Sequence, residues 1–127
     1  PPPRRSAPTI LTPHGGEFGR MFASDGSKIE QTAAAARENG CTIVHKGADT
    51  VIAHPDGRVT VSAAAPSWLA TAGTGDVLAG LIASRIAAGG TIEGAVWLHA
   101  RAAALAGPAL IADTLIDAVP AAVRECL

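Results

Sequence analysis

A glycine-rich turn that ends in an acidic residue is the stretch of this sequence best suited to chemistry. It reads Thr-Ala-Gly-Thr-Gly-Asp over residues 71–76 and leads directly into an apolar segment of helical character. Gly73 and Gly75 allow a sharp turn that presents backbone N–H groups to an anion, and a helix start adds partial positive charge there. The carboxylate of Asp76 beside a phosphoryl group indicates proton transfer from a hydroxyl. The same spacing also fits a tight loop in which Asp76 is an ordinary acid at a helix start.

A second candidate lies where an uncharged, β-branched segment ends. Residues 41–44 read Cys-Thr-Ile-Val and predict a buried strand, and Lys46 and Gly47 follow it closely. Ligands of open α/β sheets bind at the carboxyl ends of strands, where a lysine offers a point charge for phosphate and a glycine permits close backbone approach. Taken alone, Lys46 and Gly47 are more typical of a solvated strand end than of a phosphate-binding site.

His14 lies in a Pro/Gly segment with Glu17 shortly after it. A loop histidine hydrogen-bonds a polar substrate or caps a turn, and the residues alone leave both possibilities open. Trp68, just before the glycine turn, either stacks on a ring or anchors its loop to the core. The remaining histidines and the two cysteines have no spacing typical of a metal site or a disulfide framework, so we predict neither. These residues are His45, His54, His99, Cys41 and Cys126.

The elements that must position these residues alternate between helix and strand, which is typical of an α/β fold. Pro55-Asp56-Gly57 predicts a tight hairpin turn, and Pro13 with the two glycines after it predicts a loop over 12–16. A loop of small residues is expected over 63–75. The predicted strands are 9–11, 41–44, 51–54 and 58–62. The predicted helices are 17–22, 27–39, 76–88 and a helix from the N-cap Thr91 to Gly107, followed over 112–127 by one or two short helices broken at Pro120.

Composition narrows the class of protein. The chain has 127 residues, 48% of them hydrophobic and many of these Ala, so closely packed helices on a sheet are expected. A net charge of −1 gives no basic field for nucleic acid. No run approaches the ~18 apolar residues of a membrane helix. We expect a cytoplasmic protein with one domain over residues 9–127 and a flexible Pro-rich leader over 1–8.

Three motifs in series resemble one family, the ADP-dependent (S)-NAD(P)H-hydrate dehydratases, in the C-terminal half of their domain. They are LTPHGGEFGRM at 11–21, VHKGADTVIAHPDGRV at 44–59 and WLATAGTGDVLAGLIASRIAAG at 68–89. The helix AVWLHARAAALAG at 95–107 also matches, and His45 departs from the family by standing where an apolar residue is usual. The resemblance implies a ribokinase-like α/β fold, a mixed sheet between helix layers, of which this chain holds the C-terminal portion.

The resemblance also implies an activity: removal of water from hydrated NADH or NADPH, driven by ADP or ATP with Mg²⁺, as metabolite repair. Asp76 is then the catalytic base and contacts the hydrated dinucleotide together with His14. The residues implied to bind the adenine nucleotide are Lys46, Gly47, Ala48, Asp49, Thr50 and Gly75, with Gly73 in the same turn. A half-sheet would expose an apolar edge, so a homo-oligomer is expected. The alternatives are a small-molecule kinase of the same fold, acting on a vitamin precursor, and a non-catalytic nucleotide-binding module.

Overall fold

The computed structural model describes residues 6–22, 25–63 and 65–127, in two compact units, 1–63 and 64–127. Most of the predicted leader, residues 1–5, lies outside the described residues, so its flexibility stays a prediction. The assignment of residues 9–127 to one larger domain also stays a prediction.

The first unit is built on a four-stranded mixed sheet with the order β1-β2-β3-β4. The strands are β1 (Ile10–Leu11), β2 (Thr42–His45), β3 (Thr50–Ala53) and β4 (Val59–Ser62). β1 and β2 are parallel, whereas β2–β3 and β3–β4 are antiparallel. β2 is buried along its whole length, as its uncharged, β-branched sequence predicts. Gly57, at φ +96°, makes the predicted hairpin turn between β3 and β4.

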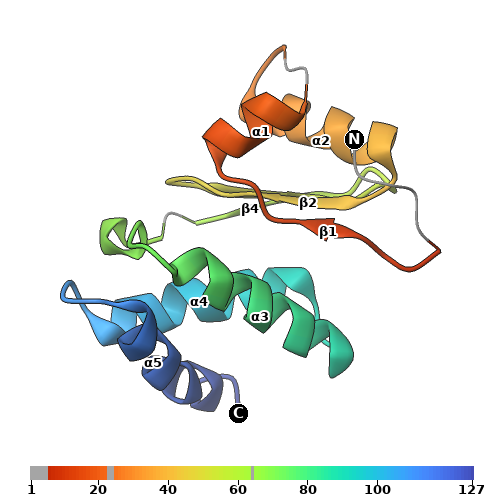
Figure 1. The fold of residues 1–127 in the computed structure, drawn as a ribbon. Coiled ribbons are helices and arrows are strands. Elements are labelled where there is room, and N and C mark those ends of the chain that lie inside the picture. Colours follow the sequence, from red (N-terminus) through yellow and green to blue (C-terminus); the bar gives the residue numbers. More distant parts are fainter. Residues whose placement is uncertain (1–5, 23–24, 64) are drawn as a thin grey trace. The chain divides into compact units, whose positions relative to one another are not determined.

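Two helices lie on one face of this sheet, α1 (Gly15–Met21) and α2 (Lys28–Asn39) (Figure 1). α2 begins at a reciprocal cap in which the backbone N–H of Ser27 donates to Glu30 Oε2 at 2.8 Å. It ends at Gly40, whose φ of +62° is the left-handed conformation expected of a helix-terminating glycine. The core beneath the helices contains Phe18, Phe22, Ala35, Ala36, Cys41, Ile43 and Ala53.

The prediction of a loop over 12–16 is wrong at its end, because α1 begins at Gly15 rather than at Glu17. The His14 side chain accepts hydrogen bonds from the first turn, and the Glu17 carboxylate accepts one from the backbone N–H of His14. This side-chain cap supplies partners for N–H groups that a short, glycine-rich helix would otherwise leave exposed.

His45 is a buried polar residue at the end of β2. Its Nδ1 lies 2.9 Å from Thr32 Oγ1 on α2, and its ring stacks on Phe18 with centroids 4.1 Å apart. The single Thr32 hydroxyl hydrogen is donated to the Lys28 carbonyl at 2.6 Å, so His45 Nδ1 carries a proton and is the donor in this pair. His45 is therefore structural, as predicted.

The second unit is helical, with a short 3₁₀ turn η1 (Ser67–Leu69) before α3 (Thr74–Ala87), α4 (Ile92–Ala106) and α5 (Ala112–Arg124). Two predictions need correction. The predicted loop over 63–75 contains η1, and α3 begins at Thr74 rather than at Asp76. α5 runs through Pro120 without a break. Leu115 and Ala122 are buried on the inner side of the helix, and Pro120 is exposed. The burial stabilises the helix by more than the loss of the hydrogen bond that proline cannot donate.

The Trp68 side chain anchors the segment before α3 to the core of this unit. Its indole Nε1–H donates to the Ala103 carbonyl on α4 at 2.9 Å, and its ring packs on the core cluster. The sequence predicts that Trp68 either stacks on a ring or anchors its loop, and the structure shows that it anchors the loop. Within the described ranges, no helix is both long and apolar enough to cross a membrane.

Burial makes the stability of the first unit depend on pH through His45. Burial, and then the nearby charge of Lys28, lower the pKa of His45 below 6.5, against an opposing effect of Asp49. Below pH ~6.5 the unfolded chain binds a proton that the folded chain excludes, so the free energy of unfolding falls as pH falls, by at most about 1.4 kcal/mol per pH unit. The variant His45→Asn keeps an N–H donor for Thr32. Chemical denaturation at pH 7.5 and 5.5 should show that its free energy of unfolding changes less with pH than that of the wild type. An unchanged dependence would contradict this assignment.

Candidate functional site

The carboxyl ends of β1 and β2 form a first candidate site within the first unit. Because these strands are parallel, their ends meet at one edge of the sheet, and the Lys46 N–H donates to the Pro13 carbonyl at 2.8 Å. A further parallel bridge pairs Lys46 with His14. The structure therefore brings together two segments that are 32 positions apart in sequence (46 − 14) and that were predicted as separate candidates.

His14 caps a helix and also exposes a ring nitrogen. Its Nδ1 accepts from the backbone N–H groups of Gly16 at 3.1 Å and Glu17 at 3.3 Å. The neutral ring therefore carries its hydrogen on Nε2, which lies 3.5 Å from Glu17 Oε1. The His14 side chain is 57% exposed. The backbone N–H of His14 lowers the pKa of Glu17. His14 can thus cap α1 and still present an Nε2–H donor to a ligand.

The predicted nucleotide segment, residues 46–50, joins β2 to β3. Lys46 is half-buried, whereas Gly47, Ala48 and Asp49 are exposed. The Asp49 carboxylate has a lowered pKa, chiefly through its own backbone N–H and then through a hydrogen bond from Lys28. Sequence reasoning missed Lys28, because only its positive charge in the first turn of α2 could have drawn attention to it.

The glycine turn at the start of α3, in the other unit, forms a second candidate site of its own. Gly73 is the N-cap at φ +85°, a conformation that favours glycine. Thr74 is buried, and its hydroxyl lies 2.8 Å from each of the Leu69 and Thr71 carbonyl oxygens. His99 Nε2 lies 2.8 Å from the Thr74 carbonyl and donates to it. The turn is therefore fixed by side chains of its own unit.

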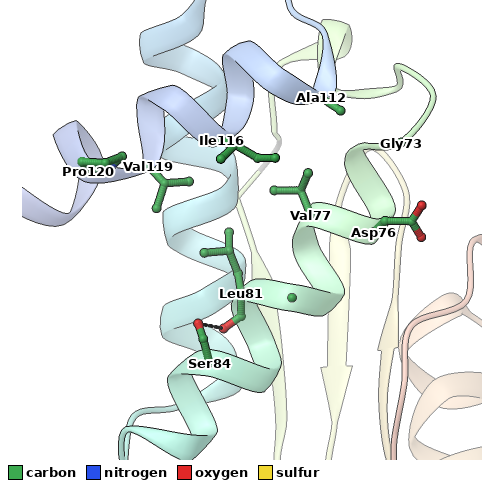
Figure 2. Close-up of a pocket in the computed structure, with 10 residues that line it drawn as sticks. Gly73, Asp76, Val77, Leu81, Ser84, Ala112, Ile116, Val119 and Pro120 are labelled. Atoms are coloured by element: carbon green, nitrogen blue, oxygen red, sulfur yellow. Dashed lines mark hydrogen bonds between the residues drawn. The ribbon is translucent and has the colours of Figure 1, made fainter.

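Asp76 is exposed in the first turn of α3. Within the described residues its carboxylate has no hydrogen bond or ion pair, and the Gly75 N–H has no acceptor. Figure 2 shows the carboxylate pointing away from the Ile116 and Val119 side chains, which face α3 across a groove of about 740 Å³. A free carboxylate beside a free N–H at a helix start is the arrangement that an anion and proton-transfer site requires, and the role of these residues stays a prediction.

Comparison with known sequences decides the family. A sequence profile of NAD(P)H-hydrate dehydratases matches residues 2–124. The chain belongs to the NAD(P)H-hydrate dehydratase family. This confirms the resemblance drawn from the three motifs.

Individual relatives agree with this membership. The chain is 44% identical over 107 residues to the bifunctional NAD(P)H-hydrate repair enzyme Nnr of Mycobacterium leprae, covering 80% of this chain and 23% of that enzyme. It is 47% identical over 105 residues to Nnr of Gloeobacter violaceus, covering 78% and 21%. This dehydratase-family chain thus spans less than a quarter of the length of these relatives.

Solved structures confirm the ribokinase-like fold. The ADP/ATP-dependent NAD(P)H-hydrate dehydratase of Bacillus subtilis, co-crystallised with ATP and Mg²⁺, aligns with a TM-score of 0.87 and 33% identity, over 97% of this chain and 50% of that one. A ribokinase-like superfamily protein of Enterococcus faecalis aligns with a TM-score of 0.76 and 29% identity, over 91% and 44%. The chain therefore spans about half of these solved domains.

A substitution at Gly73 tests the geometry of the glycine turn. A Cβ there would lie 3.2 Å from the Ala112 Cβ, and the positive φ disfavours any L side chain. Gly73→Ala should therefore lower the free energy of unfolding by about 1–2 kcal/mol. Gly80→Ala is the matched control, since nothing lies within 4 Å of its Cβ position in the middle of α3. It should stabilise by roughly 0.5–1 kcal/mol. Equal effects in urea denaturation would contradict the assigned turn.

Proposed function

We propose that this chain is the nucleotide- and substrate-binding portion of a hydro-lyase that dehydrates (S)-NAD(P)H hydrate with ADP or ATP. The observation that carries the proposal is the Gly73–Asp76 turn, in a chain of the dehydratase family. At this turn the Asp76 carboxylate and the Gly75 N–H have no partner among the described residues. The relatives named for this reaction support the same conclusion.

The proposed reaction begins with proton removal by Asp76. The hydroxyl oxygen on the hydrated nicotinamide ring attacks the terminal phosphoryl group, its proton passes to Asp76, and the bond from phosphorus to the nucleotide oxygen breaks. With ADP, AMP leaves. The ring then loses phosphate and a proton and regains its double bond, so the hydroxyl oxygen departs with the phosphate. Phosphate is a far better leaving group than hydroxide, which explains the need for nucleotide.

The chain's own groups have separate tasks in this proposal. In the second unit, the backbone N–H groups of Gly73 and Gly75 stabilise charge on the transferring phosphoryl group of the nucleotide. In the first unit, residues 46–50, with the Lys46 ammonium, bind adenine nucleotide, and the Nε2–H of His14 binds the dinucleotide. Mg²⁺, present with ATP in the B. subtilis crystals, would enter with the nucleotide and neutralise its phosphate charge.

A small-molecule kinase is the second candidate, because the glycine turn serves phosphoryl transfer to any hydroxyl. The fold that the chain shares with the ribokinase-like E. faecalis protein supports this candidate. Recovery of the reduced-nicotinamide absorbance from hydrated NADH and ADP favours the dehydratase. Phosphorylation of an alcohol without that recovery favours the kinase. Nucleotide binding without turnover of either substrate favours a non-catalytic module.

Location and assembly belong to the same proposal. The free thiols of Cys41 and Cys126 suit a reducing cytoplasm. Self-association is proposed through the sheet, since β4 exposes the apolar side chains of Val59 and Val61.

Nucleotide should stabilise the folded chain. A ligand that binds only the folded state adds RT ln(1 + [L]/Kd), about 2.7 kcal/mol at a hundredfold excess over Kd, and several degrees in melting temperature. We expect a rise with ADP or AMP that is smaller in Lys46→Ala and absent in Gly75→Val, whose side chain fills the anion site. Differential scanning fluorimetry measures this. An unchanged wild-type midpoint at millimolar ADP would count against a nucleotide site in this chain.

The role of Asp76 is tested separately from binding. Asp76→Asn should lower turnover by roughly 10²–10⁴-fold, the range of a general base, while the Kd for ADP stays within about threefold. Recovery of reduced-nicotinamide absorbance reports turnover, and calorimetry reports binding. Asp113→Asn, which alters the acid in the first turn of α5, is the matched control and should behave like wild type. Near-normal turnover of Asp76→Asn would remove Asp76 from the role of base.

A further inference from the structure

Lys28 touches the candidate nucleotide segment from a different element. Its ammonium group, on the first residue of α2, donates to the Asp49 carbonyl and lies 3.3 Å from Asp49 Oδ1. The Lys28 side chain is only 26% exposed, against 57% for Asp49. Backbone and side chain of one loop residue are thus held by a single partly buried cation.

The same ammonium occupies the space beside Gly47. A Cβ added to Gly47 would lie 2.6 Å from Lys28 Nζ and 3.2 Å from the Asp49 carbonyl oxygen. Gly47 has no positive φ, so its backbone conformation does not require glycine. A side chain at position 47 would therefore force the Lys28 ammonium to shift.

The start of α2 fixes Lys28 in turn. The cap between Ser27 and Glu30 sets the first turn of the helix, with the Glu30 N–H 3.3 Å from Ser27 Oγ. The carbonyl of Lys28 accepts from Thr32 Oγ1, which is itself held by His45 at the end of β2. The lysine backbone is thus connected through two hydrogen bonds to the strand that leads into the loop.

We propose that Lys28 is a positioning residue for nucleotide binding, which orders residues 46–50 and neutralises Asp49 before the nucleotide arrives. The inference rests on the proposed function of that segment. Ordering the loop in advance removes an entropic cost from binding, and pairing Asp49 removes a negative charge that would repel phosphate. Gly47 is part of the same device, because any larger residue would displace the ammonium from Asp49.

Amide hydrogen exchange in the absence of nucleotide tests the ordering directly. Lys28→Met keeps the apolar stem and removes every donor, and should speed exchange over residues 47–49 by roughly tenfold, a typical effect of losing a charged hydrogen bond. The strands β2 and β3 should keep their protection. Arg37→Ala, which removes a cation from the other end of α2, is the matched control and should leave the loop unchanged. Unchanged exchange in Lys28→Met would overturn the proposal.

Binding and a double-variant cycle complete the test. Calorimetry should show an ADP Kd raised about three- to tenfold in Lys28→Met and near wild type in Lys28→Arg, which retains donors. Gly47→Ala should reproduce the loss, and Lys28→Ala/Gly47→Ala should be no worse than Lys28→Ala alone. Additive effects would overturn the link between the two residues, and faster exchange with an unchanged Kd would overturn the role in binding. If wild type binds no ADP, the proposed function fails, while the exchange result still decides whether Lys28 orders the loop.

Discussion

Both candidate ligand loops depend on one constraint: a buried histidine must find a hydrogen-bond partner. Each unit contains such a histidine, and each pairs it with a threonine near a helix start. His45 donates to the Thr32 hydroxyl in α2, and His99 donates to the Thr74 carbonyl in α3. An unpaired buried polar group costs about 1–3 kcal/mol, so each pair holds its helix start in one place. A loop beside each of these helix starts is the proposed site of ligand binding.

The turn at the start of α3 suits phosphoryl transfer because it meets two opposing structural requirements. The N–H groups that meet a transferring phosphoryl group must be in place before reaction, whereas the backbone carrying them must turn too sharply for most residues. The structure separates the two requirements. Gly73 supplies the positive φ, and the buried Thr74 fixes the turn through its hydroxyl and carbonyl. The carboxylate of Asp76, in the first turn of α3, has no hydrogen bond or ion pair within the described residues.

Sequence reasoning succeeded where a local pattern decides the structure. The buried β2, the hairpin at Gly57 and the helix ending at Gly40 follow from β-branching and from glycine conformations, and the three motifs in series gave the family. It failed where a contact distant in sequence or an unusual cap decides. The start of α1 at Gly15 and an exposed proline within α5 contradict ordinary propensity. No pattern in the sequence indicates that Lys28 approaches Asp49, which is 21 positions away.

The turn at the start of α3 is proposed to bind the phosphate of an adenine nucleotide. The most direct measurement is an NMR titration of ¹⁵N-labelled chain with ADP, following the backbone amide resonances of Gly73, Gly75 and Asp76. Those resonances should shift and saturate, with Gly75 shifting most because its N–H has no acceptor in the described residues. Gly89 and Gly90, at the opposite end of the same helix, should stay in place. An unmoved Gly75 resonance at saturating ADP, or shifts confined to other parts of the chain, would contradict the account.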